Sequence, residues 1–119
     1  MKLYAEVIIN SDALEIDKPF TYEIPENYIK LVKIGQWVKV PFGYRNSMDA
    51  FIIKLIEQEE IKEFEIKEIN KIENIEPLLT EDDLKIVNFL KDNYLCKYID
   101  AIRLFIPQGI LKGIKNKQK

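Results

Sequence analysis

The stretch Ile34–Arg45, which reads IGQWVKVPFGYR, constrains the fold more than any other part of the sequence. Side-chain types alternate along its first half, which is the pattern of a β-strand with one face towards a core. Both valines fall on the core face together with Phe42, whereas Trp37 and Lys39 share the opposite face. We therefore expect an exposed tryptophan beside a lysine, a combination that marks an interface more often than an ordinary surface.

Pro41 and Gly43 are expected to end this strand. A proline cannot donate a hydrogen bond to a sheet, and a glycine permits a tight turn and the close approach of another backbone or a ligand. The following residues, Tyr44 to Asp49, are then predicted to form an exposed loop with Tyr44 and Arg45 at its tip.

Further segments carry strand patterns. Residues 3–9 and 20–24 alternate as half-buried strands do, and residues 50–56 are apolar on both faces, which is typical of a central strand covered on both sides. Residues 57–65 are charged and are expected to form a solvated connection. In residues 66–75 isoleucines recur every three positions, which favours a helix over a strand, although the asparagines and the dense charges make a weak helix.

The last third of the chain is predicted to be helical. Thr80 is followed by three acidic residues, which is the sequence of a helix start, and an apolar stripe then continues to about Asn93. Residues 98–106 offer a second, shorter helix that Pro107 ends. Strands followed by helices predict a mainly β protein of the α+β class.

Composition excludes several functional classes. The 119 residues fit one domain and include no histidine and a single cysteine, so imidazole-based catalysis and nearly all zinc sites are excluded for these residues. The phosphate-binding motif G-x-x-x-x-G-K-[ST] is absent, so we expect no ATPase activity from this chain. No residue is predicted to be catalytic or metal-binding. Neither a secretory signal nor an apolar run of about 18–20 residues is present, which predicts a cytoplasmic protein without a membrane partner.

Aromatic residues and cations are interleaved between positions 20 and 45. The aromatic residues are Phe20, Tyr22, Trp37, Phe42 and Tyr44, and the cations include Lys39 and Arg45. Single-stranded nucleic acids bind by stacking bases on aromatic faces, at about 1–3 kcal/mol per base, beside cations that follow the phosphates. The same residues also suit an ordinary core and surface, and the net charge of -2 differs from that of a strongly basic nucleic-acid binder. The alternative is an SH3-like or translation-factor-like barrel that mediates protein-protein interaction by binding a peptide through Trp37 and Tyr44.

Two motifs resemble a known family. FTYEIP at residues 20–25 and IGQWVKVPFG at residues 34–43 are similar to the motif pair of the amino-terminal domain of PriA, the primosomal replication-restart helicase, and the similarity covers residues 4–108. The resemblance implies one domain at residues 1–108, with residues 109–119 as a linker or tail. This domain would begin with a small antiparallel β-barrel-like part and end with one or two C-terminal helices. It also favours a strand over a helix for residues 66–75.

The resemblance implies a function and a site. In that family the domain binds the 3′ end of a nascent strand at stalled or forked DNA without sequence specificity. Matched position by position, the pocket for the terminal nucleotide would here be lined by Phe20, Thr21, Gly43 and Lys67. Some family members have an aspartate in place of Thr21, so a hydroxyl would make that hydrogen bond here. Further candidates for DNA contacts are Trp37, Lys39, Tyr44 and Arg45.

Whole members of the family continue with a winged-helix domain, an ATPase motor and a zinc-binding insertion. The resemblance therefore implies that this chain is the DNA-binding module of an ATP-dependent DNA helicase, without enzymatic activity or a cofactor of its own. ATP, magnesium and zinc would be bound elsewhere in the full-length protein. Other primosome proteins and the single-stranded-DNA-binding protein would be partners through that full-length protein.

Overall fold

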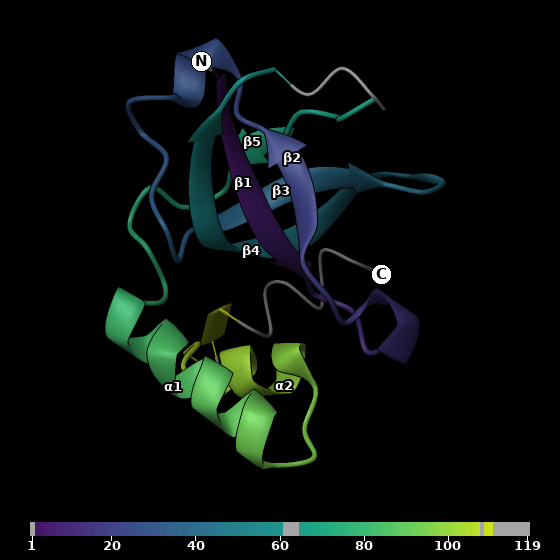
Figure 1. Ribbon diagram of the computed structural model, residues 1–119, viewed down its shortest axis with the longest axis vertical. Helices are drawn as coiled ribbons and strands as arrows, with labels where there is room; N and C mark the ends of the chain where they lie inside the picture. The colour runs from purple at the N-terminus through teal and green to yellow at the C-terminus, as the bar shows by residue number, and fades with distance from the viewer. Residues whose placement is uncertain (1, 61–64, 108, 111–119) are drawn as a thin grey trace.

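The computed structural model describes residues 2–60, 65–107 and 109–110, which form a curved antiparallel sheet above two helices (Figure 1). The strands are β1 (Lys2–Ile9), β2 (Phe20–Glu23), β3 (Trp37–Phe42), β4 (Arg45–Gln58) and β5 (Lys71–Ile72), and the helices are α1 (Glu81–Asn93) and α2 (Tyr98–Arg103). Short 3₁₀ turns lie at Leu14–Ile16 and Glu26–Tyr28. The strand order is β2-β1-β4-β3-β5, so β4 is central, as predicted for residues 50–56. This arrangement confirms the mainly β, α+β fold.

The segment 67–73 hydrogen-bonds to both sides of the sheet. At β2, the Glu23 N–H donates to the Lys67 carbonyl at 2.9 Å, and the Ile69 N–H donates to the Glu23 carbonyl at 3.1 Å. The later residues, which include β5, pair with β3. The sheet curves without a continuous closing ladder, so the barrel-like description holds only loosely. The helix favoured by the isoleucine spacing at 66–75 is wrong, because backbone partners on β2 and β3 hold this segment extended.

The two faces of the sheet form two separate hydrophobic cores. Buried residues inside the curve include Val7, Val38 and Ile52. The opposite face, which includes Ile8 and Phe51, is covered by α1 and α2. Because both faces are buried, the central strand has an apolar run instead of a simple alternation.

Side-chain caps begin both helices. The Thr80 hydroxyl accepts from the Asp83 N–H at 3.0 Å, and the Asp83 carboxylate accepts from the Thr80 N–H at 2.9 Å, which confirms the predicted start of α1 as a capping box. The cap of α2 comes from the loop after β1. There the Asp17 carboxylate accepts from the N–H groups of the first two residues of α2, at 2.7 and 3.0 Å.

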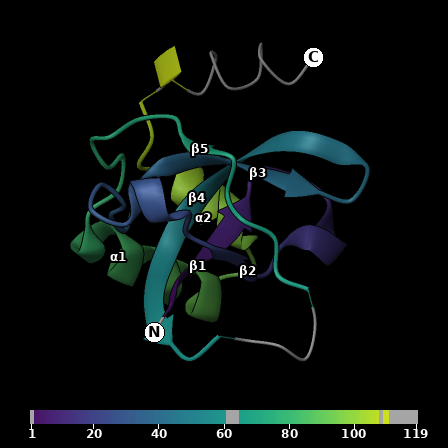
Figure 2. The same ribbon diagram turned by 90° about the horizontal axis from the view of Figure 1, so that it is seen from above.

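Strands β3 and β4 form a hairpin that extends beyond the rest of the sheet (Figures 1 and 2). Phe42 pairs with Arg45, which leaves Gly43 and Tyr44 as the turn. The loop predicted for Tyr44–Asp49 is therefore wrong beyond this turn, since β4 already begins at Arg45 and takes up hydrogen bonds across the hairpin. The strand β3 also continues through the proline, where the pairing register shifts, instead of ending there.

The charged segment after residue 56 is only partly described. β4 extends to Gln58, beyond the predicted strand at 50–56 and into the predicted connection at 57–65. Within that connection, residues 61–64 lie outside the described residues, and so does most of the predicted tail at 109–119. None of the helices in the described part of the chain is long and apolar enough to cross a membrane.

Candidate nucleic-acid interface

The four residues that the family resemblance assigns to a DNA 3′ end line one cavity of about 390 Å³, which we call the end cavity. Phe20 and Thr21 come from β2, Gly43 from the hairpin turn, and Lys67 from the extended segment before β5. The full lining is Pro19, Phe20, Thr21, Tyr22, Pro41, Phe42, Gly43, Glu65, Ile66 and Lys67. Three distant parts of the chain thus meet at one place beside the sheet.

Two half-buried aromatic rings form one wall of the end cavity. The rings of Phe20 and Phe42 have centroids 4.9 Å apart and planes inclined at 76°, an edge-to-face arrangement that fixes both rings. The Lys18 Nζ lies 5.8 Å from the centroid of Phe20. Thr21 is exposed next to this wall, so its hydroxyl is accessible to a ligand. An aromatic face, a hydroxyl and a nearby cation are groups that bind a base, its edge and a phosphate.

Tyr22 ties the strand β2 to the hairpin behind the cavity. Its hydroxyl donates a 2.7 Å hydrogen bond to the carbonyl of Pro41. Burial raises the pKa of Tyr22 to about 12, so the hydroxyl stays protonated as a donor near neutral pH. This hydrogen bond holds the proline carbonyl at the point where the register of β3 shifts, immediately before the turn.

Gly43 and Lys67 form the other sides of the cavity. Gly43 has a φ of +57°, in the left-handed region that favours glycine, and a Cβ there would have no atom within 4 Å. The space beside its backbone is therefore open. Lys67 has an exposed side chain and is held by the hydrogen bond of its carbonyl to β2. Within the described residues it makes no ion pair, so its ammonium is available to a phosphate.

Trp37 and Lys39 lie outside the end cavity, and the expectation that Trp37 is exposed is wrong. The Trp37 side chain is 8% exposed because α1 and α2 cover that face of the sheet. Its Nε1 donates to Oδ1 of Asp49 at 2.5 Å, and the Lys39 Nζ forms an ion pair with the same oxygen at 2.6 Å. A buried ring offers no open face for stacking a base. Sequence analysis missed Asp49, because a simple turn at Gly43 and Tyr44 would place Met48 opposite Lys39. The register shift between Val40 and Phe42 brings Asp49 there instead.

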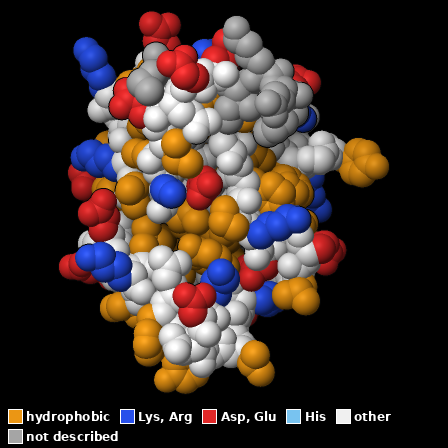
Figure 3. Space-filling model, in the orientation of Figure 1, with side chains coloured by type: hydrophobic (Ala, Val, Ile, Leu, Met, Phe, Trp, Pro, Cys, Tyr) orange, Lys and Arg blue, Asp and Glu red, His pale blue; other side chains and the backbone are white. Residues whose placement is uncertain are grey.

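Tyr44 and Arg45 are exposed at the hairpin tip, as predicted. Tyr44 is 105% exposed, and both residues line a second, larger cavity beside the hairpin. On the face drawn in Figure 3, lysine and arginine side chains are interspersed with acidic ones. The visible surface is therefore not broadly basic, and any attraction to phosphates must come from a few placed cations.

Comparison with known proteins identifies the family of this chain. Residues 6–107 match the family model of the PriA 3′ DNA-binding domain. The chain belongs to this family. It is 31% identical over 107 residues to the replication restart protein PriA of Bacillus subtilis, and 29% identical over 109 residues to PriA of Chlamydia trachomatis. These alignments cover 90% and 89% of the chain but only 13% and 14% of the two relatives.

Membership of the PriA 3′ DNA-binding domain family confirms two predictions from the sequence: the family and DNA as a ligand. The chain corresponds to one domain of its much longer relatives. Within its described residues, no group of three or more Cys, Asp or Glu residues is arranged to hold a metal ion.

Proposed function

We propose that this PriA-type domain binds the free 3′ terminus of a DNA strand at stalled or forked DNA, without reading its sequence. The observation that supports this function is the convergence of Phe20, Thr21, Gly43 and Lys67 on the end cavity. These residues come from three separate segments, and the family resemblance alone assigns all four to a DNA 3′ end.

Each side of the cavity suits one part of a terminal nucleotide. Phe20 supports a face of the base, and every base has such a face, so this contact does not select a sequence. Thr21 donates to or accepts from a polar edge. The open space beside Gly43 lets a sugar with a free 3′ hydroxyl approach the backbone. Lys67 neutralises the one phosphate of the terminal nucleotide, which lies on its 5′ side.

The wider role extends the same proposal. The full-length protein that contains this domain would be an ATP-dependent helicase of the primosome, acting in the cytoplasm. ATP, magnesium and zinc would be bound by its other domains, and contacts to other primosome proteins and to the single-stranded-DNA-binding protein would involve the full-length chain. The share of 13% and 14% that this chain covers in its relatives leaves room for such domains.

A titration of the isolated domain tests the proposed function. Fluorescently labelled single strands of equal length and mixed sequence, with the 3′ hydroxyl either free or phosphorylated, are compared at several salt concentrations. We expect tighter binding of the free end, and an affinity that falls as salt rises because a phosphate contact releases counterions. Equal affinity for both ends contradicts end recognition. If neither strand binds, the peptide-binding alternative is favoured, although the burial of Trp37 removes one of the two contacts proposed for it.

A further inference from the structure

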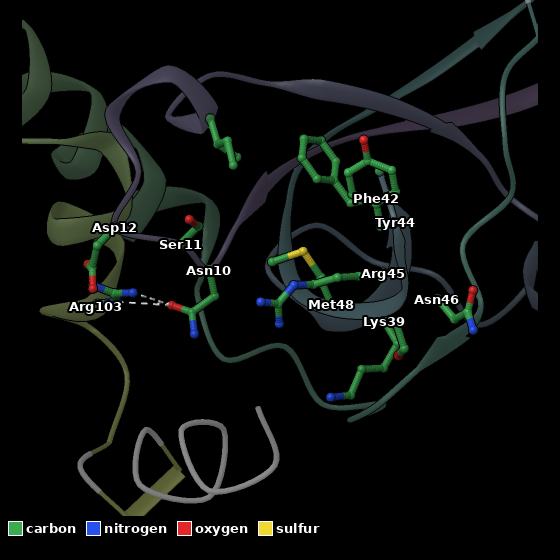
Figure 4. A pocket seen from close by; sticks show the side chains of 13 residues that line it. Asn10, Ser11, Asp12, Lys39, Phe42, Tyr44, Arg45, Asn46, Met48 and Arg103 are labelled. Carbon is green, nitrogen blue, oxygen red and sulfur yellow. Dashed lines mark hydrogen bonds and ion pairs between the residues drawn. The ribbon is translucent and has the colours of Figure 1, made fainter. Parts of the chain in front are cut away.

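The end cavity adjoins a second, larger cavity of about 900 Å³, which we call the tip groove. Phe42 and Gly43 line both, so the two spaces adjoin at the hairpin turn. The tip groove lies between the hairpin and the loop that follows β1, and its volume is more than twice that of the end cavity. Figure 4 shows the side chains that line it.

The tip groove contains three cations, two of which are already neutralised. The Lys39 Nζ is 2.6 Å from the Asp49 carboxylate, and the Arg103 Nη1 is 2.6 Å from the Asp12 carboxylate. Arg45 differs, since it is exposed and makes no ion pair in the described part of the chain. In Figure 4 its guanidinium points from the hairpin into the space towards the pair of Arg103 and Asn10.

An exposed aromatic ring stands next to this free cation. Tyr44 follows Gly43 in the turn and has no protein atoms covering it, with 105% of its reference area exposed. An aromatic side chain at a hairpin tip gains nothing for the fold from such exposure, whereas an uncovered ring beside a cation is the pair of groups that holds a base and its phosphate. The groove therefore has one exposed aromatic ring and, among the described residues, one cation without an ion pair.

A DNA strand that ends in the end cavity must leave it on the 5′ side, because the terminal nucleotide has no other phosphodiester. We propose that the nucleotides immediately 5′ of the terminus lie in the tip groove, with a base on Tyr44 and a phosphate on Arg45. This inference rests on the proposed function and adds a second subsite to it. The domain would then contact the terminal nucleotide and the nucleotides next to it. A ligand of one nucleotide would fill only the end cavity.

A length series tests the tip groove. Binding of a nucleoside 5′-monophosphate and of a six-nucleotide strand, both with a free 3′ hydroxyl, is measured for the wild-type domain and for Arg45→Ala, Tyr44→Ala and Lys54→Ala. Lys54 is an exposed lysine of β4 that lines neither cavity. Lys54→Ala therefore removes one positive charge, as Arg45→Ala does, without changing the tip groove. Unchanged urea unfolding curves establish that the variants at these exposed positions remain folded.

For Arg45→Ala we expect about a threefold to fivefold weaker binding of the six-nucleotide strand, the size of one exposed ion pair. The slope of its plot of log affinity against log salt concentration should be smaller in magnitude by about 0.7, which corresponds to the loss of one phosphate contact on a single strand. Tyr44→Ala should weaken the same strand at least about fivefold. Both variants should bind the nucleoside 5′-monophosphate as the wild-type domain does, because this ligand does not reach the tip groove. Lys54→Ala should match the wild type on both ligands.

The outcomes separate the two proposals. If Arg45→Ala and Tyr44→Ala bind the six-nucleotide strand as tightly as the wild type, or weaken binding of the mononucleotide by the same factor, the tip groove is not a subsite. That result leaves end recognition intact. If the wild-type domain does not prefer a free over a phosphorylated end, the proposed function is wrong, and a length-dependent effect of Arg45 then assigns the groove to internal nucleotides.

Discussion

The indole Nε1 of Trp37 donates a 2.5 Å hydrogen bond to the carboxylate of Asp49, and the acid that receives it is completely buried. The same carboxylate oxygen is 2.6 Å from the Lys39 Nζ, whose side chain is only 12% exposed. This contact joins β3 to β4 on the face of the sheet that the helices cover. It lies at the base of the hairpin whose residues line both cavities. Residues first considered as DNA contacts therefore support the hairpin from inside.

Removal of the buried acid should destabilise the domain. Asp49→Ala leaves an indole N–H and a mostly buried ammonium without their shared partner, and we expect a loss of about 3 kcal/mol or more in the free energy of unfolding. Glu57→Ala, which removes an exposed acid from the same strand, should change it by less than about 0.5 kcal/mol. Urea unfolding measures both. Similar effects of the two substitutions would show that the buried contact contributes little.

The two glycines with positive φ should respond differently to a methyl group. At Gly35, with a φ of +91°, a Cβ would overlap the carbonyl oxygen of Leu79, so Gly35→Ala should cost more than about 3 kcal/mol or prevent folding. At Gly43 the Cβ would meet open space, and Gly43→Ala should cost about 1–2 kcal/mol from backbone strain alone. Thermal unfolding compares them, and equal losses would contradict the assignment of Gly35 to packing.

The hydrogen bond from Tyr22 to Pro41 predicts a specific dependence of stability on high pH. Because burial raises the pKa of Tyr22 to about 12, the unfolded chain loses this proton first, and stability falls as the pH rises from about 10 towards 12. Tyr22→Phe should cost about 1 kcal/mol at pH 8. This difference should shrink by about 1 kcal/mol at pH 11, since the variant cannot ionise. Urea unfolding at both pH values measures it, and a constant difference would contradict the raised pKa.

Capping of α2 by Asp17 gives a graded prediction. Asp17→Ala removes the acceptor of two backbone N–H groups and should cost about 1–2 kcal/mol, whereas Asp17→Asn keeps a good capping group and should cost less. The two unfolding free energies are compared under identical conditions. If asparagine is no better than alanine, the carboxylate acts through its charge and not as a cap.

Local patterns predicted the strands and the first helix well, because alternation and capping involve neighbouring residues. Non-local contacts explain what was missed. Residues 67–73 are extended because β2 and β3 offer them backbone partners, which isoleucine spacing cannot reveal. The cap of α2 lies 81 residues away from its helix. Trp37 was expected to be exposed because strand alternation places it on the face opposite the valines. Alternation does not reveal that α1 and α2 cover this face as well.

For the candidate site, the family resemblance was more informative than the residue pattern. Composition suggested an aromatic and basic cluster that mixed buried and exposed members. Position-by-position matching selected four residues that share one cavity, although no local signal links Lys67 to the hairpin. Among the residues that line the tip groove, Tyr44 and Arg45 were candidates from the sequence. Asn10 and Arg103 were not, because no local pattern links two residues that are 93 positions apart.

By the proposed function, the end cavity distinguishes a free 3′ hydroxyl from a blocked one. Thr21 and Lys67 are both exposed, so their substitution should leave the fold unchanged. Two matched variants serve as controls. Thr21→Ser keeps the hydroxyl, and Lys54→Ala removes an equivalent charge away from the cavity.

The most direct measurement is the affinity of Thr21→Ala and Lys67→Ala for one strand with its 3′ hydroxyl free and then phosphorylated. We predict that each substitution weakens binding of the free end by about 1–2 kcal/mol, the range of a hydrogen bond to a charged or buried partner. Binding of the blocked end should hardly change, and Thr21→Ser and Lys54→Ala should retain the preference for the free end. If Thr21→Ala and Lys67→Ala weaken free and blocked ends equally, the cavity does not recognise a 3′ terminus, and Lys67 is one of several nonspecific phosphate contacts.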